Sequence, residues 1–493
     1  MILLIVTKSI CVPSIYIVPI VVKKIFNMNR KIQFVVIIFG LFLFNTASAQ
    51  NKRAKVYYIS FDKNQPITAN PIKEYIQDSL SSTAKDKLWI YPKLQFQTIT
   101  GIGGCFNEIG GEALLSLNPE KQKEILTNLF DTINGCGFSF CRTAIGSSDF
   151  GIDGYSYSEK AGDYEMKSFS IKRDEKFVLP YIKAALHVNP DVKIFASPWS
   201  PPSRLKESGT LVGKENNNTL IDSPQIFTAY AKYLSKYITE YAKSGVTIHR
   251  ITPQNETDAN TNYPSCLMPP AQMSQFILKY LSPEFKRRNV STQIWAGTYR
   301  VYGKFEALEL LADANLRKSI AGIGIQYTKA PNIVDLKTLF PEVKMMHTEG
   351  ICYNGDNSIV QAQKRLKEIT DYLCNGVENY AYWNMILNET GKSGWNWKQN
   401  ALININRTNG SITYNPDYAV MYLISKFIKK GDVRIAHYLS IDAPCIALKS
   451  PKGTYKMIVQ NDENTEKTVI LQLENQSIPV KISALSLAAI ELN

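Results

Sequence analysis

The sequence has few residues of the kinds that bind metal ions or cross-link small domains. It contains eight cysteines and no CxxC pair, and seven cysteines, an odd number, remain after residue 49. This pattern excludes a zinc ribbon, a thioredoxin-like motif and a disulfide scaffold, so the cysteines in apolar runs are expected to be buried small hydrophobes. Only four histidines occur, and none has the spacing of metal ligands. We therefore predict no metal site and no cofactor.

Acidic residues are absent from the first 49 positions. From Met28 this stretch has the order of a secretion signal: basic Asn29-Arg30-Lys31, an apolar run at 32–44, and small Ala47-Ser48-Ala49 before Gln50. We predict a leader over residues 1–49, with Met28 as an alternative start, cleavage near Ala49 and Gln50, and a secreted or periplasmic protein. The alternative is a membrane anchor, but the apolar run is short for a span of about 20 residues, so the mature form is expected to have no integral membrane span.

A basic stripe of the kind that binds nucleic acids is also missing. The formal net charge is +13, and the leader holds five Lys and Arg residues, so the rest carries +8. These charges are scattered among acids, which indicates a solvated surface and no nucleic-acid partner. The sequence makes no prediction of the oligomeric state.

The length and composition predict a large globular domain with a smaller one attached. The chain has 493 residues, of which 45% are hydrophobic and 20% charged. Between residues 101 and 430, apolar strand candidates alternate with segments of helical period such as Pro119–Leu129, Pro224–Tyr241 and Ile359–Tyr372. Eight strands are expected, at 101–106, 138–144, 192–197, 246–252, 292–297, 321–327, 343–348 and 379–384. This alternation predicts an α/β fold, a closed (β/α)8 TIM barrel.

Short strands without helices flank the predicted barrel on both sides. Residues 50–100 show strand-like alternation, and residues 431–493 return to short strands and turns, at 433–438, 446–448, 455–460, 468–473 and 487–492. We expect the C-terminal strands to form an attached antiparallel β-sandwich, joined by the N-terminal ones.

Two of the barrel strands end in glutamate. Glu256 follows the fourth strand and Glu349 the seventh. Side chains at the carboxyl ends of barrel strands gather at one mouth, so the two carboxylates are expected to face each other. A retaining glycosidase needs such a pair about 5–5.5 Å apart, one protonated and one ionised. Asn255, beside Glu256, could bind the sugar 2-hydroxyl. The alternative for a single glutamate is the start of a solvated loop.

Seven motifs in order resemble one family. They are GIGGCFNE (101–108), CRTAIGSSDF (141–150), ASPWSPPSRLK (196–206), TPQNE (252–256), YPSC (263–266), HTEG (347–350) and YWNMILNETGKSGWNW (382–397). The chain resembles glycoside hydrolase family 30, on the branch with glucosylceramidase and β-1,6-glucanases. The resemblance implies a retaining β-glycosidase with Glu256 as acid/base and Glu349 as nucleophile. It also implies a sugar-binding set of Asp149, Trp199, Asn255 and Trp383, with Arg142 as a support near the nucleophile.

Each implied residue also has an alternative structural interpretation. Trp199 and Trp383 offer faces and N–H groups to a pyranose, or they are core aromatics. Asp149 offers an acceptor for two neighbouring hydroxyls, or it is a helix cap or turn residue. Arg142 would be a costly buried charge unless a carboxylate such as Glu349 pairs with it. Trp395 is expected at the leaving-group side, with simple packing as the alternative.

The sixth strand departs from the family pattern. The family usually carries His-x-Tyr at its end, with the tyrosine beside the nucleophile, whereas this chain has Gln326-Tyr327-Thr328. Tyr327 is therefore shifted by one position. Tyr327 is still expected as a supporting residue near the nucleophile. On a strand, a shift of one residue turns the side chain to the opposite face, so the effect of this departure on the nucleophile and on the edge of the subsite stays open.

The sequence favours a secreted retaining β-glucosidase-type hydrolase acting on a carbohydrate, either a β-1,6-glucan or a glucosyl conjugate. A β-xylosidase or xylanase of the same family is the alternative among enzymes. Asp149 argues against it, because xylose has no C6 hydroxyl to bind that acceptor. A non-catalytic carbohydrate-binding barrel is the alternative from another class. The presence of both Glu256 and Glu349 argues against that, since binding alone needs no acid and nucleophile.

Overall fold

The computed structural model describes residues 54–77, 83–213, 217–300 and 304–492. The predicted leader and its cleavage point lie outside these residues. Within the described ranges, no helix combines the length and the apolar character that a membrane crossing requires.

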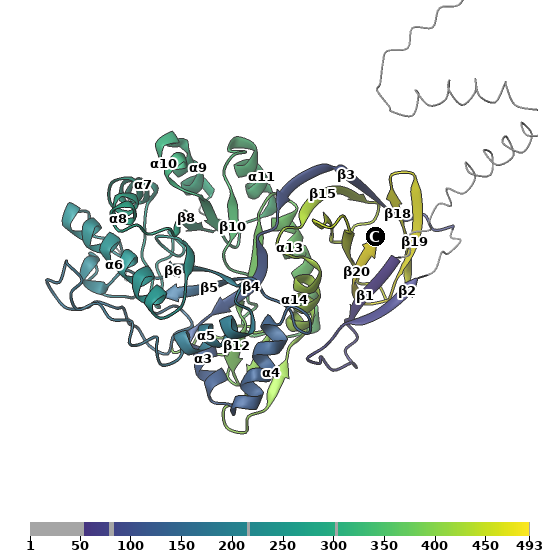
Figure 1. The fold of residues 1–493 in the computed structure, drawn as a ribbon, viewed down its shortest axis with the longest axis horizontal. Helices are drawn as coiled ribbons and strands as arrows, with labels where there is room; N and C mark the ends of the chain where they lie inside the picture. Colours follow the sequence, from purple (N-terminus) through teal and green to yellow (C-terminus); the bar gives the residue numbers. More distant parts are fainter. Residues whose placement is uncertain (1–53, 78–82, 214–216, 301–303, 493) are drawn as a thin grey trace, which may run out of the picture. The chain divides into compact units, whose positions relative to one another are not determined.

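Eight parallel strands form the barrel (Figure 1). They are β4 (Gly101–Phe106), β5 (Phe140–Ile145), β6 (Lys193–Pro198), β7 (Ile248–Ile251), β8 (Gln293–Tyr299), β9 (Gly322–Ile325), β10 (Met345–His347) and β11 (Asn379–Asn384). All eight predicted strands are confirmed, two with the predicted bounds and the others shifted by a few residues. The sheet runs in the order β10-β9-β8-β7-β6-β5-β4-β11.

A side chain closes the seam between the first and last strands of this sheet. The Asn379 amide accepts a hydrogen bond from the His347 N–H (3.1 Å) and donates one to the His347 carbonyl oxygen (2.7 Å). It thus continues the ladder between β10 and β11.

Close packing of β4 against β5 depends on glycine: a Cβ on Gly103 would lie 2.2 Å from the carbonyl oxygen of Phe140 on β5. The glycine-rich first motif therefore brings β4 against β5.

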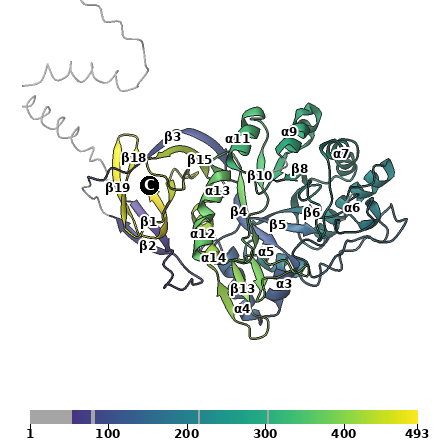
Figure 2. The same cartoon turned by 180° about the vertical axis from the view of Figure 1, so that it is seen from behind.

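Helices surround the barrel strands (Figures 1 and 2). They are α3 (Glu108–Leu115), α4 (Pro119–Phe130), α5 (Val178–Val188), α6 (Pro224–Lys243), α7 (Pro270–Phe276), α8 (Ser282–Arg287), α9 (Lys304–Ala312), α10 (Ala314–Ser319), α11 (Ala330–Leu339), α12 (Ile359–Gln363), α13 (Arg365–Leu373) and α14 (Pro416–Phe427), with a 3-10 turn at Ser203–Leu205 and a π turn at Ile277–Leu281. The helices predicted at Pro119 and Pro224 start there, capped by the side chains of Asn118 and Ser223. The helix predicted over 359–372 is instead two helices.

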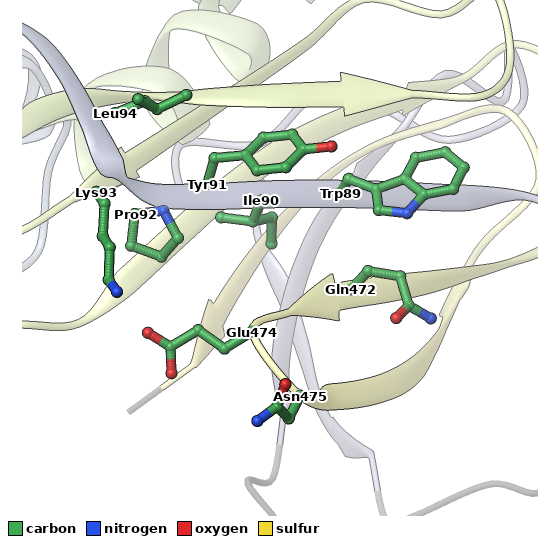
Figure 3. A pocket seen from close by; sticks show the side chains of 9 residues that line it. All are labelled: Trp89, Ile90, Tyr91, Pro92, Lys93, Leu94, Gln472, Glu474 and Asn475. Atoms are coloured by element: carbon green, nitrogen blue, oxygen red, sulfur yellow. The ribbon is translucent and has the colours of Figure 1, made fainter. Parts of the chain in front are cut away.

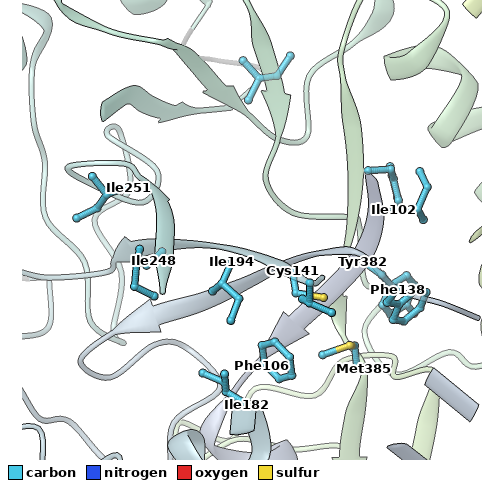
Figure 4. Packing of buried hydrophobic residues seen from close by; sticks show 14 of the residues in the cluster. Ile102, Phe106, Phe138, Cys141, Ile182, Ile194, Ile248, Ile251, Tyr382 and Met385 are labelled. Atoms are coloured by element: carbon cyan, nitrogen blue, oxygen red, sulfur yellow. The ribbon is translucent and has the colours of Figure 1, made fainter. Parts of the chain in front are cut away.

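The core lies between the barrel strands and these helices. Its residues include Phe106 from β4, Ile182 from α5 and Ile194 from β6, all fully buried (Figure 4). Of the seven described cysteines, five are buried and all are free thiols. The prediction that cysteines act as buried hydrophobes is confirmed for those five, Cys105, Cys136, Cys141, Cys266 and Cys445.

A nine-stranded sheet forms the second structural element. Its strands are β1 (Ala54–Ser60), β2 (Lys73–Gln77), β3 (Lys87–Thr98), β15 (Val433–Leu439), β16 (Cys445–Lys449), β17 (Tyr455–Asn461), β18 (Lys467–Leu473), β19 (Gln476–Ile482) and β20 (Ser486–Leu492). Their order is β19-β18-β3-β15-β16-β17-β20-β1-β2. The N-terminal strands join the C-terminal ones, as predicted, and they enclose a separate hydrophobic core.

The nine-stranded sheet differs from the prediction in two respects, and a separate small sheet was not predicted. β18 pairs with β3 in parallel, because the chain crosses from β17 to the far side of β3 instead of returning as a hairpin. The sequence pattern missed β2 and β19, the two edge strands, and β19 contains Pro479, which an edge tolerates. It also missed the small sheet of β12 (Ile386–Asn388), β13 (Ile403–Ile405) and β14 (Ile412–Tyr414) between β11 and α14.

Candidate active site

The predicted site residues come from several barrel strands and from the connections that follow the carboxyl ends of these strands. Arg142 lies on β5 and Trp383 on β11, while Trp199 directly follows β6. Asn255 and Glu256 lie near the start of the connection from β7 to α7, and Glu349 lies two residues beyond β10. These positions agree with the barrel mouth at which (β/α)8 enzymes place their chemistry.

The backbone holds Glu256 in an unusual conformation. Its φ is +46°, in the left-handed region that residues other than glycine seldom adopt. The hydroxyl of Thr298 on β8 accepts a hydrogen bond from the Glu256 N–H (2.9 Å), and the Asn255 N–H donates to the carbonyl oxygen of Pro198 (2.7 Å). Neighbouring strands thus fix a strained backbone, as is common where a side chain must be aimed.

One amide group joins the two glutamates. Gln326 Nε2 donates to Glu256 Oε1 (3.1 Å) and lies 3.4 Å from Glu349 Oε2. Its orientation is set by the Thr348 hydroxyl, which donates to Gln326 Oε1 (2.6 Å). Since both carboxylate oxygens lie near the same nitrogen, they are at most about 6.5 Å from each other. A retaining pair is separated by about 5–5.5 Å, and an inverting pair by about 6.5–9.5 Å.

Glu349 is surrounded by donors. Arg142 Nη1 lies 2.7 Å from its Oε2, and the Tyr327 hydroxyl donates to its Oε1. Both Arg142 and Glu349 are buried. Burial raises the pKa of Glu349, while the Arg142 guanidinium and the Tyr327 hydroxyl oppose this rise. Because these donors stabilise the carboxylate form, Glu349 is the member of the pair suited to remain ionised.

Tyr327 contacts Glu349 although its sequence position is shifted by one residue. β9 ends at Ile325, so the alternation of a strand no longer applies two residues later. The φ of Tyr327 is +51°, and this left-handed turn directs the ring toward Glu349. The tyrosine thus contacts Glu349 from a shifted sequence position, where a supporting residue is expected, because the backbone turns where the strand has ended.

Glu256 has a weaker set of donors. Besides the neutral amide of Gln326, the Glu256 carboxyl group has the cation of Arg300 nearby: Arg300 Nη1 lies 3.5 Å from Glu256 Oε2. Arg300 Nε donates to Asp258 Oδ1 (2.8 Å). Burial, together with the negative charge of Glu349, raises the pKa of Glu256 to about 7. Glu256 therefore holds its proton to a higher pH than an ordinary glutamate, whereas the donors around Glu349 oppose the protonation of that carboxyl group. The two carboxyl groups thus differ in the way that an acid and a nucleophile must differ.

Buried polar atoms without protein partners surround the pair. Asp149 is 5% exposed, and its Oδ1 accepts no hydrogen bond from the described part of the chain; the same holds for the donor Trp383 Nε1. Burial and the charges of Glu349 and Glu256 raise the pKa of Asp149, which indicates that the three carboxyl groups lie close together. Unsatisfied buried polar atoms of this kind are where ligand hydroxyls are expected.

The aromatic residues are arranged differently from the expectation of open faces. The rings of Trp199 and Trp383 stack on one another with centroids 5.1 Å apart, and the guanidinium of Arg142 lies over both, 4.6 and 5.6 Å from the centroids. Since these faces are occupied, the edge of Trp383 with its N–H is the part suited to bind a sugar hydroxyl. Trp395, half-buried, donates through Nε1 to the carbonyl oxygen of Ser148 (3.1 Å) and so lies beside Asp149.

The side-chain carbonyl oxygen of Asn255 accepts hydrogen bonds from three residues. Arg142 Nη2 (2.7 Å), Thr298 Oγ1 (3.2 Å) and Gln326 Nε2 (3.4 Å) all point to Asn255 Oδ1. This leaves its NH2 group directed away from those donors, as the predicted contact to a sugar hydroxyl requires.

The sequence did not single out several residues of this site. Gln326 was noted only as a departure, and Arg300, Thr298 and Tyr263 were not singled out. Tyr263 lies near the carboxylates: its pKa rises first through burial and then through the charges of Asp149, Glu256 and Glu349. Its ring meets that of Trp397 edge-on at 5.8 Å. The YPSC motif was the available signal for Tyr263, whereas Arg300 and Thr298 lie in no recognised motif.

The comparison with family models decides the family. The model described as "Glycosyl hydrolase family 30 TIM-barrel domain" matches residues 99–428. The chain belongs to glycosyl hydrolase family 30. It is therefore a glycoside hydrolase that acts on carbohydrates. In the described residues of this family 30 enzyme, no group of three or more His, Cys, Asp and Glu side chains is arranged to hold a metal ion.

Curated relatives and solved structures resemble this family 30 enzyme over most of its length. It is 28% identical over 402 residues to the lysosomal acid glucosylceramidase of Mus musculus, covering 76% of this chain and 77% of the relative. It is 25% identical over 421 residues to the endo-1,6-beta-D-glucanase neg1 of Aspergillus fumigatus, covering 77% and 81%. The structure of the endo-beta1,6-glucanase BT3312 has a TM-score of 0.78 at 23% identity, covering 89% and 99%, and shows the same fold.

Proposed function

We propose that this enzyme hydrolyses β-glucosidic bonds with retention, using Glu349 as nucleophile and Glu256 as acid/base. The Glu349 carboxylate attacks the anomeric carbon while Glu256 gives its proton to the leaving oxygen. Glu256 then takes a proton from water, which attacks the glycosyl–Glu349 ester and releases the sugar. Arg142 and Tyr327 hold the nucleophile in its ionised form, and Asn255 binds the 2-hydroxyl.

The observation that carries this proposal is the amide of Gln326, which lies within hydrogen-bonding reach of both carboxyl groups. It supports a separation short enough for direct attack on the sugar and too short for an interposed water. Product stereochemistry tests it. Proton NMR of an early time point on an aryl β-glucoside should show the β-anomer before mutarotation. An initial α-anomer would require an inverting mechanism.

The pH dependence follows from the protonation of Glu256. Its raised pKa of about 7 means that the acid form is present below this value and is lost as the pH rises through it. We expect kcat/KM for an aryl β-glucoside with a poor leaving group to fall with a midpoint near pH 7. In Glu256→Ala, measured on a dinitrophenyl glucoside, this basic limb should disappear. If kcat/KM of that variant still fell with the same midpoint, the loss of activity at high pH would belong to another titrating group.

We propose a β-1,6-glucan as the first candidate substrate and a glucosyl conjugate such as glucosylceramide as the second. The names of the relatives, glucosylceramidases and endo-1,6-glucanases, support this pair of candidates. The product profile separates them. Oligosaccharides from β-1,6-glucan indicate endo cleavage, glucose alone indicates exo cleavage, and release of ceramide with inactivity on the glucan supports the conjugate.

Asp149 is proposed to select glucose over xylose through the C6 hydroxyl. We expect Asp149→Ala to lower kcat/KM on an aryl β-glucoside by about 10- to 100-fold, the effect of losing one charge-assisted hydrogen bond. The same change should alter kcat/KM on the matching β-xyloside by less than about threefold. Equal losses of kcat/KM on both substrates would mean that Asp149 does not bind the C6 hydroxyl. A parent enzyme that prefers the xyloside would favour the xylosidase alternative.

We also propose that the enzyme is exported after removal of residues 1–49. The absence of acids before Gln50 and the small residues at 47–49 support this. N-terminal sequencing of protein recovered from outside the cytoplasm should give a start near Gln50. Recovery of the intact segment in a membrane fraction would favour the anchor.

A further inference from the structure

The outer face of β3 carries aromatic side chains that the catalytic site does not use. Along this strand, Leu88 and Ile90 are buried in the core of the nine-stranded sheet, while Trp89 and Tyr91 alternate with them and point outward. Tyr91 is 45% exposed. Single exposed apolar residues are common, but exposed apolar side chains that lie together in one patch mark interaction sites.

The neighbouring strands extend this face. Trp89 pairs in register with Tyr438 on β15, which is 61% exposed, and with Gln472 on β18. The rings of Trp89 and Tyr438 are tilted toward each other with centroids 5.5 Å apart. Three adjacent strands thus present an amide, an indole and a phenol in one row.

A groove of about 740 Å³ adjoins this row (Figure 3). β18 ends at Leu473, and the chain turns through Glu474, whose φ is +53°, and Asn475 into β19. β3 continues beyond this turn as far as Thr98, which leaves the groove between the two. Its lining consists of Trp89, Ile90, Tyr91, Pro92, Lys93, Leu94, Gln472, Glu474 and Asn475. The volume lies within the range of about 300–1,000 Å³ that ligand sites occupy.

The chemistry of the lining matches a neutral sugar. Lys93 and Glu474 contribute one charge of each sign, so the groove favours neither an anion nor a cation. The aromatic residues offer ring faces to the C–H side of a pyranose. The side chains of Gln472, Glu474 and Asn475 offer donors and acceptors to its hydroxyls. Trp89 and Tyr91 are two residues apart on one strand, about 7 Å, so one sugar chain can reach both.

A second protein chain fits this surface less well. Nine residues line the groove, whereas a stable protein interface uses about 20–30 residues on each side. We propose that the groove around Trp89 and Tyr91 is a second carbohydrate-binding site that holds a segment of a β-glucan chain. The choice of glucan rests on the proposed function; the saccharide class rests on the lining itself. None of its residues belongs to the catalytic pair or its neighbours, so it binds the polymer without taking part in hydrolysis.

Binding is tested by affinity electrophoresis of the full chain in gels that contain soluble β-1,6-glucan. The Glu349→Gln background keeps the polymer intact. We expect Trp89→Ala combined with Tyr91→Ala to raise the apparent Kd about tenfold or more, and Tyr91→Ala alone, which truncates an exposed side chain, to raise it less. Ile133→Ala, at a position 76% exposed in the α4–β5 connection, is the control and should leave retardation unchanged.

Kinetics with Glu349 intact separate this site from the catalytic one. The double variant should keep kcat/KM on an aryl β-glucoside within about twofold of the parent value, and this result also shows that the variant folds. Its rate of hydrolysis of dilute β-1,6-glucan should fall at least about fivefold. Unchanged retardation in both variants would overturn the inference. So would sedimentation velocity showing a parent dimer that the double variant dissociates. If the parent enzyme hydrolyses no β-glucoside, the proposed function fails on its own, and the gel still reports on the groove.

Discussion

Replacing Glu349 by alanine is expected to lower kcat/KM on aryl β-glucosides by at least about 10⁴-fold, whatever the leaving group. The substitution removes the atom that attacks the anomeric carbon, so an activated leaving group cannot compensate. It also leaves the buried guanidinium of Arg142 without its 2.7 Å carboxylate partner. Steady-state kinetics on 4-nitrophenyl and 2,4-dinitrophenyl β-glucosides give the measurement, with circular dichroism as the check on folding.

Two controls distinguish a chemical loss from a structural one. Glu349→Gln keeps the size and the hydrogen-bond acceptor but not the nucleophile, so it should be as inactive as Glu349→Ala and more stable. Azide can take the place of the missing carboxylate, and a single displacement by azide inverts the sugar, so any rescued product should be the α-glycosyl azide. If Glu349→Ala or Glu349→Gln kept kcat/KM within about tenfold of the parent enzyme, Glu349 could not be the nucleophile.

Replacing Glu256 by alanine is expected to produce losses that depend on the leaving group. For poor leaving groups the loss of the proton donor should cost about 10²–10⁴-fold in kcat/KM. A dinitrophenolate leaves without a proton, so glycosylation from that substrate should change by no more than about tenfold. Hydrolysis of the intermediate would then lack its general base. The glycosyl–enzyme should accumulate, and a pre-steady-state burst should precede slow turnover.

Azide distinguishes the two glutamates by product configuration. In Glu256→Ala a small anion needs no general base and can occupy the space of the missing carboxylate, so azide should accelerate turnover on the dinitrophenyl glucoside. The product should be the β-glycosyl azide, because two inversions retain configuration. A β-azide from Glu349→Ala together with an α-azide from Glu256→Ala would require the two assignments to be exchanged.

The fold and the positions of the two glutamates could be predicted because both depend on short-range regularities. Eight apolar runs alternate with helical segments, and Glu256 and Glu349 each follow such a run at the barrel mouth. A strand fixes the place where its last residues emerge, so a glutamate just beyond it is located by the strand. Arg142 could be expected to pair with a carboxylate because an unpaired buried guanidinium is costly.

The contacts of Tyr327 and Gln326 with the pair could not be predicted in detail because they depend on conformations outside the strands. Tyr327 reaches Glu349 through a left-handed φ of +51°, which strand alternation does not anticipate. Gln326 lies within hydrogen-bonding reach of both carboxyl groups only because Thr348 orients its amide. Trp199 and Trp383 lie in recognised motifs, but their mutual stacking is a tertiary contact between the residue after β6 and β11 that the sequence pattern does not encode.

The central claim is that Glu349 forms the covalent bond to the sugar while Glu256 moves the proton. A 2-deoxy-2-fluoroglucoside with an activated leaving group tests it directly, because the fluorine slows both steps and the good leaving group restores the first. Mass spectrometry of the proteolysed enzyme should find one fluoroglucosyl group on the peptide that contains Glu349, and none in Glu349→Gln. A label on the peptide that contains Glu256, or no label together with product of inverted configuration, would contradict the account.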